Sequence, residues 1–174
     1  SQLQYIDLTV KIMSTFGVKI TKNGNIYTAD GEISSTSSVI EGDWSQACFY
    51  LSAAALGGKI TLEGLNLNSV QGDKAVIELY KSFGTEIVAQ KSKIIANGKK
   101  IKAIKINCAQ IPDAVPALAV VAAAAKGVTE ICGGERLRIK ETDRIKTVIS
   151  GLTAMGVKVE EKPDGMIITG GKVK

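Results

Sequence analysis

The stretch Phe83-Gly84-Thr85-Glu86-Ile87 decides the fold of this 174-residue chain, because its pattern occurs three times. In each copy an amphipathic helix ends at a glycine, an alternating strand follows, and a second short strand closes a hairpin before another glycine. The copies align without gaps, starting at Phe16, Phe83 and Met155 and closing at Gly31, Gly98 and Gly170. The sequence therefore predicts an internal repeat built from a helix and a β-hairpin.

Further matching pieces precede the last two copies at a constant offset of 70 residues. Paired aspartates mark the starts of two helices in each copy: Asp43 and Asp113, then Asp73 and Asp143. Residues 43–98 and 113–170 are each predicted to run helix, strand, helix, strand, strand. Residues 99–112 supply a joining strand, and the predicted fold class is α+β.

The first copy is shorter, because residues 5–31 match only the second half of the unit. A repeat unit needs its whole sheet to bury its apolar face. A chain that starts in mid-unit is thus expected to be part of a longer protein.

Composition excludes several functional classes. The chain is 45% hydrophobic and has no apolar run long enough to cross a membrane, so we expect a cytoplasmic protein without a membrane partner. Its three cysteines are far apart and are expected to be buried free thiols, with no metal-ligand spacing. Histidine is absent, which removes most Ser/His and Cys/His catalytic schemes. The net charge of +5 is spread along the chain and favours a small anionic substrate over nucleic acid.

The run from Arg138 to Arg144 concentrates charges of both signs just before an amphipathic helix. Arg136, Lys140 and Arg144 are spaced four apart, so on one helix face they would repel one another until an anion binds. Glu141, four residues before Ile145, is expected to lean toward the buried face. Asp113 is expected to cap its own helix. The alternative interpretation of the run is a solvated helix start with local ion pairs.

Four segments together resemble the 5-enolpyruvylshikimate-3-phosphate synthase family: Tyr5-Ile6-Asp7, Glu41-Gly42-Asp43, Ile111-Pro112-Asp113 and the run from Arg138 to Arg144, which contains Lys140-Glu141-Thr142-Asp143-Arg144. The repeats alone would also fit the UDP-N-acetylglucosamine enolpyruvyl transferases. The resemblance implies two domains, each of three βαβαββ units. Residues 1–41 would then be a half unit at the end of the N-terminal domain. Residues 42–174 would be a partial C-terminal domain, with units at about 43–98 and 113–170.

The resemblance also implies roles for individual residues. Asp113 corresponds to the carboxylate that takes the proton from the attacking 5-hydroxyl of shikimate 3-phosphate. Glu141 corresponds to the group that handles the proton on the enolpyruvyl methylene carbon, and partial burial would raise its pKa for this work. The implied substrate-binding residues are Lys140, Arg144, Tyr5 and Arg136. The implied reaction uses phosphoenolpyruvate and requires no metal and no organic cofactor.

Several motifs of that family are absent from the sequence, including its N-terminal lysine-serine motif and its C-terminal arginine and lysine segments. We therefore expect the isolated chain to lack synthase activity and the missing N-terminal domain to be its partner. Two alternatives remain open from the sequence. One is the UDP-sugar relative, and the other is a non-catalytic module that binds anions.

Overall fold

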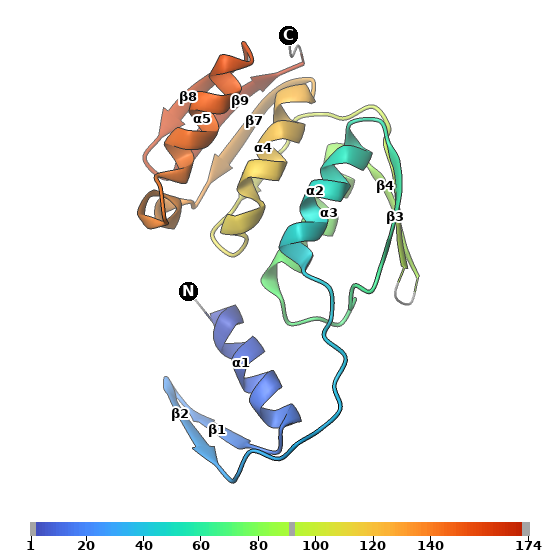
Figure 1. Ribbon diagram of the computed structural model, residues 1–174. Helices are drawn as coiled ribbons and strands as arrows, with labels where there is room; N and C mark the ends of the chain where they lie inside the picture. The colour runs from blue at the N-terminus through green and yellow to red at the C-terminus, as the bar shows by residue number, and fades with distance from the viewer. Residues whose placement is uncertain (1–2, 91–92, 172–174) are drawn as a thin grey trace. The chain divides into compact units, whose positions relative to one another are not determined.

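The computed structural model of the protein describes residues 3–90 and 93–171. The chain divides into two compact units, residues 1–41 and residues 42–174, which are drawn in blue and in teal to red in Figure 1. Each unit is described by itself. Among the described residues, no helix is both long enough and apolar enough to cross a membrane.

The first unit consists of one helix and one hairpin. Helix α1 (Leu3–Thr15) is followed by β1 (Lys19–Asn23) and β2 (Ile26–Asp30), which pair antiparallel. Gly17 has a φ of 88° and lets the chain leave the helix and enter β1. This unit therefore has the helix–strand–strand order predicted for the second half of a repeat.

The second unit contains two copies of one arrangement. The first copy comprises α2 (Trp44–Ala55), β3 (Lys59–Glu63), the 3₁₀ helix η1 (Gly72–Ala75), α3 (Val76–Phe83), β4 (Glu86–Gln90) and β5 (Lys93–Asn97). The second comprises η2 (Pro112–Ala114), α4 (Val115–Ala124), β7 (Gly127–Cys132), η3 (Glu135–Ile139), α5 (Arg144–Ala154), β8 (Lys158–Lys162) and β9 (Gly165–Gly170). The strand orders are β3-β5-β4 and β7-β9-β8, so the last strand of each copy lies in the middle. The predicted α+β repeat fold is confirmed.

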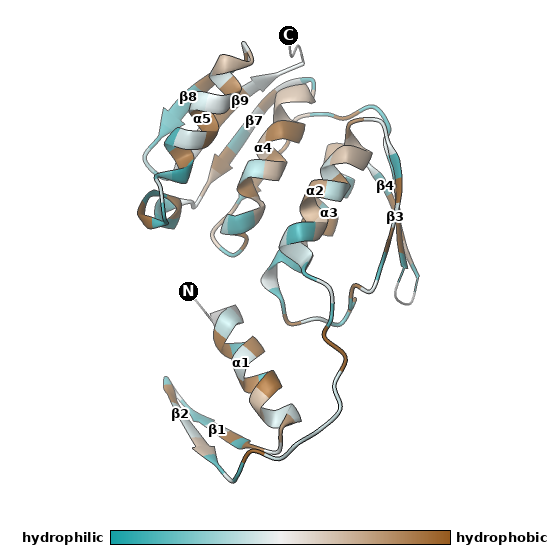
Figure 2. Cartoon of the chain, in the orientation of Figure 1, coloured by the Kyte–Doolittle hydropathy of each residue, from teal (hydrophilic) through white to brown (hydrophobic). Residues whose placement is uncertain are grey.

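Helices α2 and α4 form the centre of the second unit, where they pack against each other and against the strands. They are apolar on most sides, and Trp44, Leu51 and Leu118 are completely buried. Figure 2 shows the hydrophobic colouring of α4 and of the strand beside it, whereas hydrophilic residues lie at the start of α2. The two copies thus share one core, and the polar ends of their helices remain available for a site.

Equivalent glycines close both copies in the same way. A β-carbon at Gly98 would overlap the carbonyl oxygen of Ala54 at the end of α2. A β-carbon at Gly170 would overlap the carbonyl oxygen of Ala122 near the end of α4. Each hairpin therefore approaches the carboxyl end of its own central helix so closely that only glycine fits.

The joining segment is less regular than predicted. Within residues 99–112 the structure forms only the short strand β6 (Lys105–Asn107), which runs parallel to β7, and an isolated bridge between Lys102 and Lys126. The expected alternation of isoleucines and lysines is present in the sequence. However, β6 pairs with one neighbour only, so few backbone hydrogen bonds hold this segment extended.

The cysteines agree with the prediction of free thiols, and two of the three agree with the prediction of burial. All three are free thiols, and Cys48 and Cys108 are buried while Cys132 is half-buried. Burial raises the pKa of the Cys48 thiol to about 12, so this group stays protonated at neutral pH.

Candidate functional site

The amino ends of α2, α4 and α5 lie at the same end of the second unit (Figure 1). Each helix is preceded by a polar segment that carries aspartate. Asp43 caps α2, because its side chain accepts hydrogen bonds from the backbone N–H groups of Ser45 and Gln46. Asp143 caps α5 by accepting from the backbone N–H of Lys146. The backbone N–H groups at the start of a helix attract anions. The charged side chains at this end therefore determine which ligands can bind there.

Asp113 is held by two cations that come from the segment leading into α5. Arg144 donates through Nη1 to Asp113 Oδ1 at 2.5 Å, and Lys140 Nζ lies 3.6 Å from the same oxygen. Between a quarter and a third of each of these three side chains is exposed. The hydrogen bond to Asp113 raises the pKa of Arg144 above its usual value. We call Asp113, Lys140 and Arg144 the Asp113 cluster.

Two predictions about this cluster are wrong. Asp113 does not cap its helix, because Pro112–Ala114 form η2, and Ala114 occupies the cap position of α4 without a side-chain hydrogen bond. Arg136 and Lys140 do not stack on Arg144 along one helix face, because α5 begins only at Arg144. The carboxylate of Asp113 instead compensates the positive charges of Lys140 and Arg144, which the sequence pattern had suggested would repel each other.

Glu141 differs from its prediction in burial and in pKa. Its side chain is 78% exposed, because it precedes α5 and the four-residue relation to Ile145 does not apply. Its carboxylate accepts from Arg144 Nη2 at 3.0 Å. A backbone hydrogen bond at Glu141 and the guanidinium of Arg144 hold the pKa of Glu141 below its usual value. The expected raised pKa is therefore wrong for this conformation.

Arg138 is a residue whose contribution the sequence analysis did not identify. Its guanidinium donates to the backbone carbonyls of Lys162 at the end of β8 and of Pro163 in the turn that follows. It also forms ion pairs with Asp143 at 3.0 Å and with Glu161 at 2.9 Å. Arg138 thus fastens the segment that carries Lys140 to the sheet. The only sequence signal for this role was its place within the charged run.

Arg136 and Tyr5 are the two remaining predicted site residues. Arg136 is exposed on η3. Tyr5 belongs to the first unit, where it lines an apolar groove between α1 and the β1–β2 hairpin, with a volume of about 440 Å³. The structure therefore brings together Asp113, Lys140, Arg144 and Glu141 in the second unit, whereas Tyr5 belongs to the first unit.

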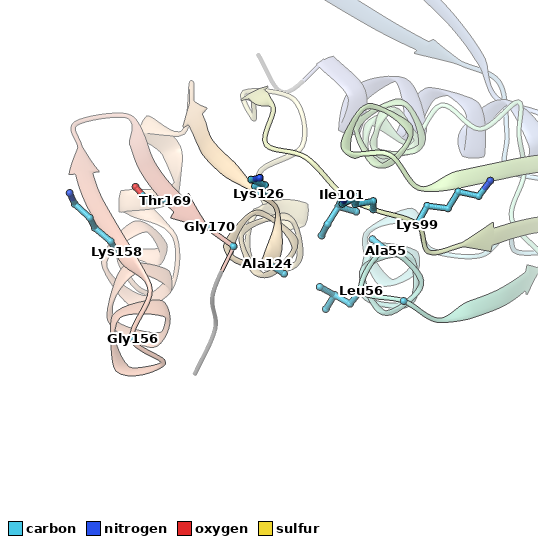
Figure 3. Close-up of a pocket in the computed structure, with 13 residues that line it drawn as sticks. Ala55, Leu56, Lys99, Ile101, Ala124, Lys126, Gly156, Lys158, Thr169 and Gly170 are labelled. Carbon is cyan, nitrogen blue, oxygen red and sulfur yellow. The ribbon is translucent and has the colours of Figure 1, made fainter.

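A second hollow lies between the two copies at the carboxyl ends of α2 and α4, the ends opposite to the Asp113 cluster. Its volume is about 780 Å³, and Leu56, Ala124 and Ile101 are among its lining residues. Figure 3 shows that Lys99 and Lys158 at its edges are far apart and point away from each other. These two lysines therefore do not converge on one position in the hollow. In residues 3–90 and 93–171, no group of three or more carboxylates and thiols is placed to hold a metal ion.

A carboxylate fixed between two cations can accept a proton from a hydroxyl while the cations bind an anion. The sequence model of one family, EPSP synthase (3-phosphoshikimate 1-carboxyvinyltransferase), matches residues 2–174 of the chain. The chain belongs to the EPSP synthase family.

Individual relatives agree with this family membership. The chain is 42% identical over 172 residues to the 3-phosphoshikimate 1-carboxyvinyltransferase of Methanocaldococcus jannaschii, covering 97% of the chain and 40% of that relative. It is 41% identical over 174 residues to the enzyme of that name from Clostridium perfringens, covering 97% of the chain and 41% of the relative. The chain therefore spans about 40% of the length of the curated relatives that it matches.

Solved structures show the same fold. An EPSP synthase from Acinetobacter baumannii superposes with a TM-score of 0.81 and 30% identity, covering 95% of the chain and 40% of that structure. The enolpyruvyl transferase NikO from Streptomyces tendae gives a TM-score of 0.74 at 15% identity, covering 95% of the chain and 40% of that structure. The second comparison concerns the fold alone. The arrangement of helices and sheets is thus that of the enolpyruvyl transferases.

Proposed function

We propose that this chain forms part of an enzyme that transfers the enolpyruvyl group of phosphoenolpyruvate to the 5-hydroxyl of shikimate 3-phosphate. The observation that carries the proposal is the Asp113 cluster, in which one carboxylate is shared by Lys140 and Arg144 in a chain of the EPSP synthase family. The relatives named above carry this activity in their names. The activity, substrates and partners of the whole protein are part of the proposal.

In the first step, the 5-hydroxyl oxygen bonds to C2 of phosphoenolpyruvate and its proton passes to Asp113. Glu141, which has to be protonated when both substrates are bound, gives its proton to C3, which becomes a methyl group. In the second step, the bond between C2 and the phosphate oxygen breaks and a proton leaves C3 for Glu141. The double bond is restored, the departing phosphate takes up the proton held by Asp113, and the products are the enolpyruvyl ether and hydrogen phosphate.

The two cations supply binding and charge compensation. Lys140 is proposed to bind the phosphate of shikimate 3-phosphate, and Arg144 the phosphoenolpyruvate, for which its planar fork is suited. Because Arg144 already donates to Asp113 and Glu141, an incoming anion has to compete with two carboxylates. Affinity for a substrate anion on this chain alone is therefore expected to be low.

Other binding groups are proposed to come from elsewhere. Tyr5 is proposed to line the shikimate pocket and Arg136 to contact substrate. Residues 1–41 are assigned to the end of the N-terminal domain and residues 42–174 to part of the C-terminal domain. Stabilising the transition state requires protein cations that contact both substrates and a site that is closed to water. We therefore expect the isolated chain to show no synthase activity.

A chimera tests the proposal. This chain replaces the matched segment of the Methanocaldococcus jannaschii relative, to which it is 42% identical. Phosphate release from phosphoenolpyruvate is then measured with and without shikimate 3-phosphate. The chimera is expected to be active, and Asp113→Asn is expected to lower kcat by about 10²–10⁴-fold, the range for a general base. Asp30→Asn, a matched change at an exposed residue of the hairpin, should leave kcat unchanged.

Two results would contradict the proposal. One is a folded chimera, checked by circular dichroism, that is inactive while the unaltered relative is active. The other is full activity in Asp113→Asn. Activity with UDP-N-acetylglucosamine in place of shikimate 3-phosphate would instead identify the UDP-sugar enzyme. Anion binding without transfer to either acceptor would identify a non-catalytic module.

A further inference from the structure

Asp73 in η1 is a half-buried carboxylate that the proposed mechanism does not use. Its Oδ2 accepts a hydrogen bond from Ser45 Oγ in the first turn of α2, at 3.1 Å. Its Oδ1 is buried and has no hydrogen-bond partner among the described residues. An ionised carboxylate with one oxygen desolvated and unpaired is poorly stabilised, so this site favours the neutral acid.

The equivalent aspartate in the second copy has the opposite surroundings. Asp143, offset from Asp73 by 70 residues, pairs with Arg138 and accepts from a backbone N–H. The residue at the position of Arg138 in the first copy is Asn68, which carries no charge. The hydrogen bonds from Lys146 and Arg138 outweigh burial and hold the pKa of Asp143 below its usual value. Burial raises the pKa of Asp73 to about 6. Of two matched carboxylates, only Asp73 is left to titrate near neutral pH.

Asp73 lies near the Asp113 cluster, because η1, which carries Asp73, and η2, which carries Asp113, both pack against α2. Three charged groups act on it: Asp43 before α2, Asp113 in η2, and Lys140 in the segment after η3. The two aspartates disfavour its ionised form, and Lys140 favours it. Lys74, its neighbour in η1, donates to the backbone carbonyl of Ser69. Asp73 and the cluster therefore respond to each other's charge.

We propose that Asp73 is a positioning residue that tunes the Asp113 cluster: its ionised carboxylate draws on Lys140 and weakens the binding of anions, and its protonated form releases Lys140 for them. This inference rests on the proposed function, because it assumes that Lys140 and Arg144 bind anions. Anion affinity then falls as pH rises through about 6. By linkage, a bound anion raises the pKa of Asp73.

The absence of histidine makes the effect measurable, because no imidazole titrates in the same pH range. Sulfate is the probe, since its charge is constant between pH 5 and 8, whereas phosphate titrates there. Sulfate affinity of the full chain is measured by amide NMR at constant ionic strength at about pH 5 and pH 7.5. One added charge beside a partly screened site is expected to weaken binding about three- to tenfold at the higher pH.

Asp73→Asn keeps the acceptor for Ser45 and removes the charge. The variant should bind sulfate at both pH values as tightly as the wild type binds it at low pH. Glu63→Gln removes one carboxylate from an exposed ion pair with Lys93 and is the control for net charge. It should keep the wild-type pH dependence. In the wild type, the carboxyl ¹³C signal of Asp73 should titrate near pH 6 and shift to higher pH in saturating sulfate.

Three results would overturn the inference while leaving the proposed function standing. They are sulfate affinity that does not change with pH, an equal pH dependence in Asp73→Asn, and titration of Asp73 near pH 4. A different result concerns the proposed function itself. If neither sulfate nor shikimate 3-phosphate shifts any residue of the cluster at any pH, the anion site is refuted and the tuning role with it.

Discussion

The substitution Gly98→Ala tests the packing of the repeat most sharply. The added β-carbon would overlap the carbonyl oxygen of Ala54 and lie 2.7 Å from the backbone N and Cα of Gly57. All of these atoms belong to the backbone, so no side chain can rotate away and the hairpin has to move off the end of α2. Overpacking of this kind costs about 1–3 kcal/mol. Because the overlapping atoms belong to the backbone, we expect Gly98→Ala to lower the free energy of unfolding by about 3 kcal/mol.

Gly170→Ala is the matching change in the second copy and should cost a similar amount. Its β-carbon would overlap the carbonyl oxygens of Ala122 and Ala125. Gly151→Ala is the control, because its β-carbon would meet no atom within 4 Å inside α5. Alanine is the better helix former there, so this variant should gain about 0.5–1 kcal/mol.

Urea unfolding of the full chain, followed by circular dichroism, gives the three free energies of unfolding. About 3 kcal/mol corresponds to a decrease in Tm of about 6–12 °C for a chain of this size. Wild-type stability in Gly98→Ala would refute the close approach of the hairpin to α2. A large loss at one of the two closing glycines and none at the other would refute the equivalence of the two copies.

Three further predictions concern buried and paired polar groups and are measured by urea unfolding. Ser52→Ala removes the hydroxyl that donates to the carbonyl of Ala117 and joins α2 to α4, and should cost about 1–3 kcal/mol; an unchanged free energy of unfolding would contradict this. Asp73→Asn should leave the free energy of unfolding unchanged below about pH 4 and raise it above about pH 6. The pKa of Asp73 is raised in the folded protein, so ionisation of this carboxylate destabilises the fold as pH rises, and asparagine cannot ionise. A pKa shift from the usual value to about 6 would correspond to a gain of about 3 kcal/mol in the free energy of unfolding, and partial exposure of Asp73 reduces this gain to about 1–2 kcal/mol. Equal stability of the wild type and Asp73→Asn at pH 7.5 would count against the burial of this carboxylate. Arg138→Lys should lower the free energy of unfolding, because an ammonium cannot reproduce the fork that reaches the carbonyl of Lys162 and the ion pairs together; full retention of stability would argue against the role of Arg138 in fastening its segment to the sheet.

The repeat could be predicted from the sequence because its signals are local. A glycine after an amphipathic helix and an alternating strand after the glycine leave a pattern within about ten residues. Three copies of that pattern strengthen one another. The pattern therefore placed α1, α3 and α5, the hairpins after them, and the closing glycines Gly98 and Gly170.

The site could be predicted less completely, because its contacts join distant residues. Periodicity could not show that α5 begins at Arg144, and this start removed Glu141 from the buried face. In the sequence, Asp113 has the position of a helix cap. In the structure, its carboxylate instead accepts a charge-assisted hydrogen bond from Arg144, which is 31 residues away in the chain. The surroundings of Asp73 also required the fold, since its unpaired oxygen and its neighbours come from separate segments.

Binding of shikimate 3-phosphate to the isolated chain tests most directly the claim that the Asp113 cluster is a substrate site. Two charge-assisted contacts without the rest of the protein imply a dissociation constant no tighter than about millimolar. In an amide NMR titration, residues 112–115 and 138–144 should shift first, and Arg144→Ala should abolish these shifts. Lys146→Ala, which removes an exposed cation from the same helix, should keep them. Shifts confined to residues 66–72, or unchanged in Arg144→Ala, would show that the charged run is only a solvated helix start.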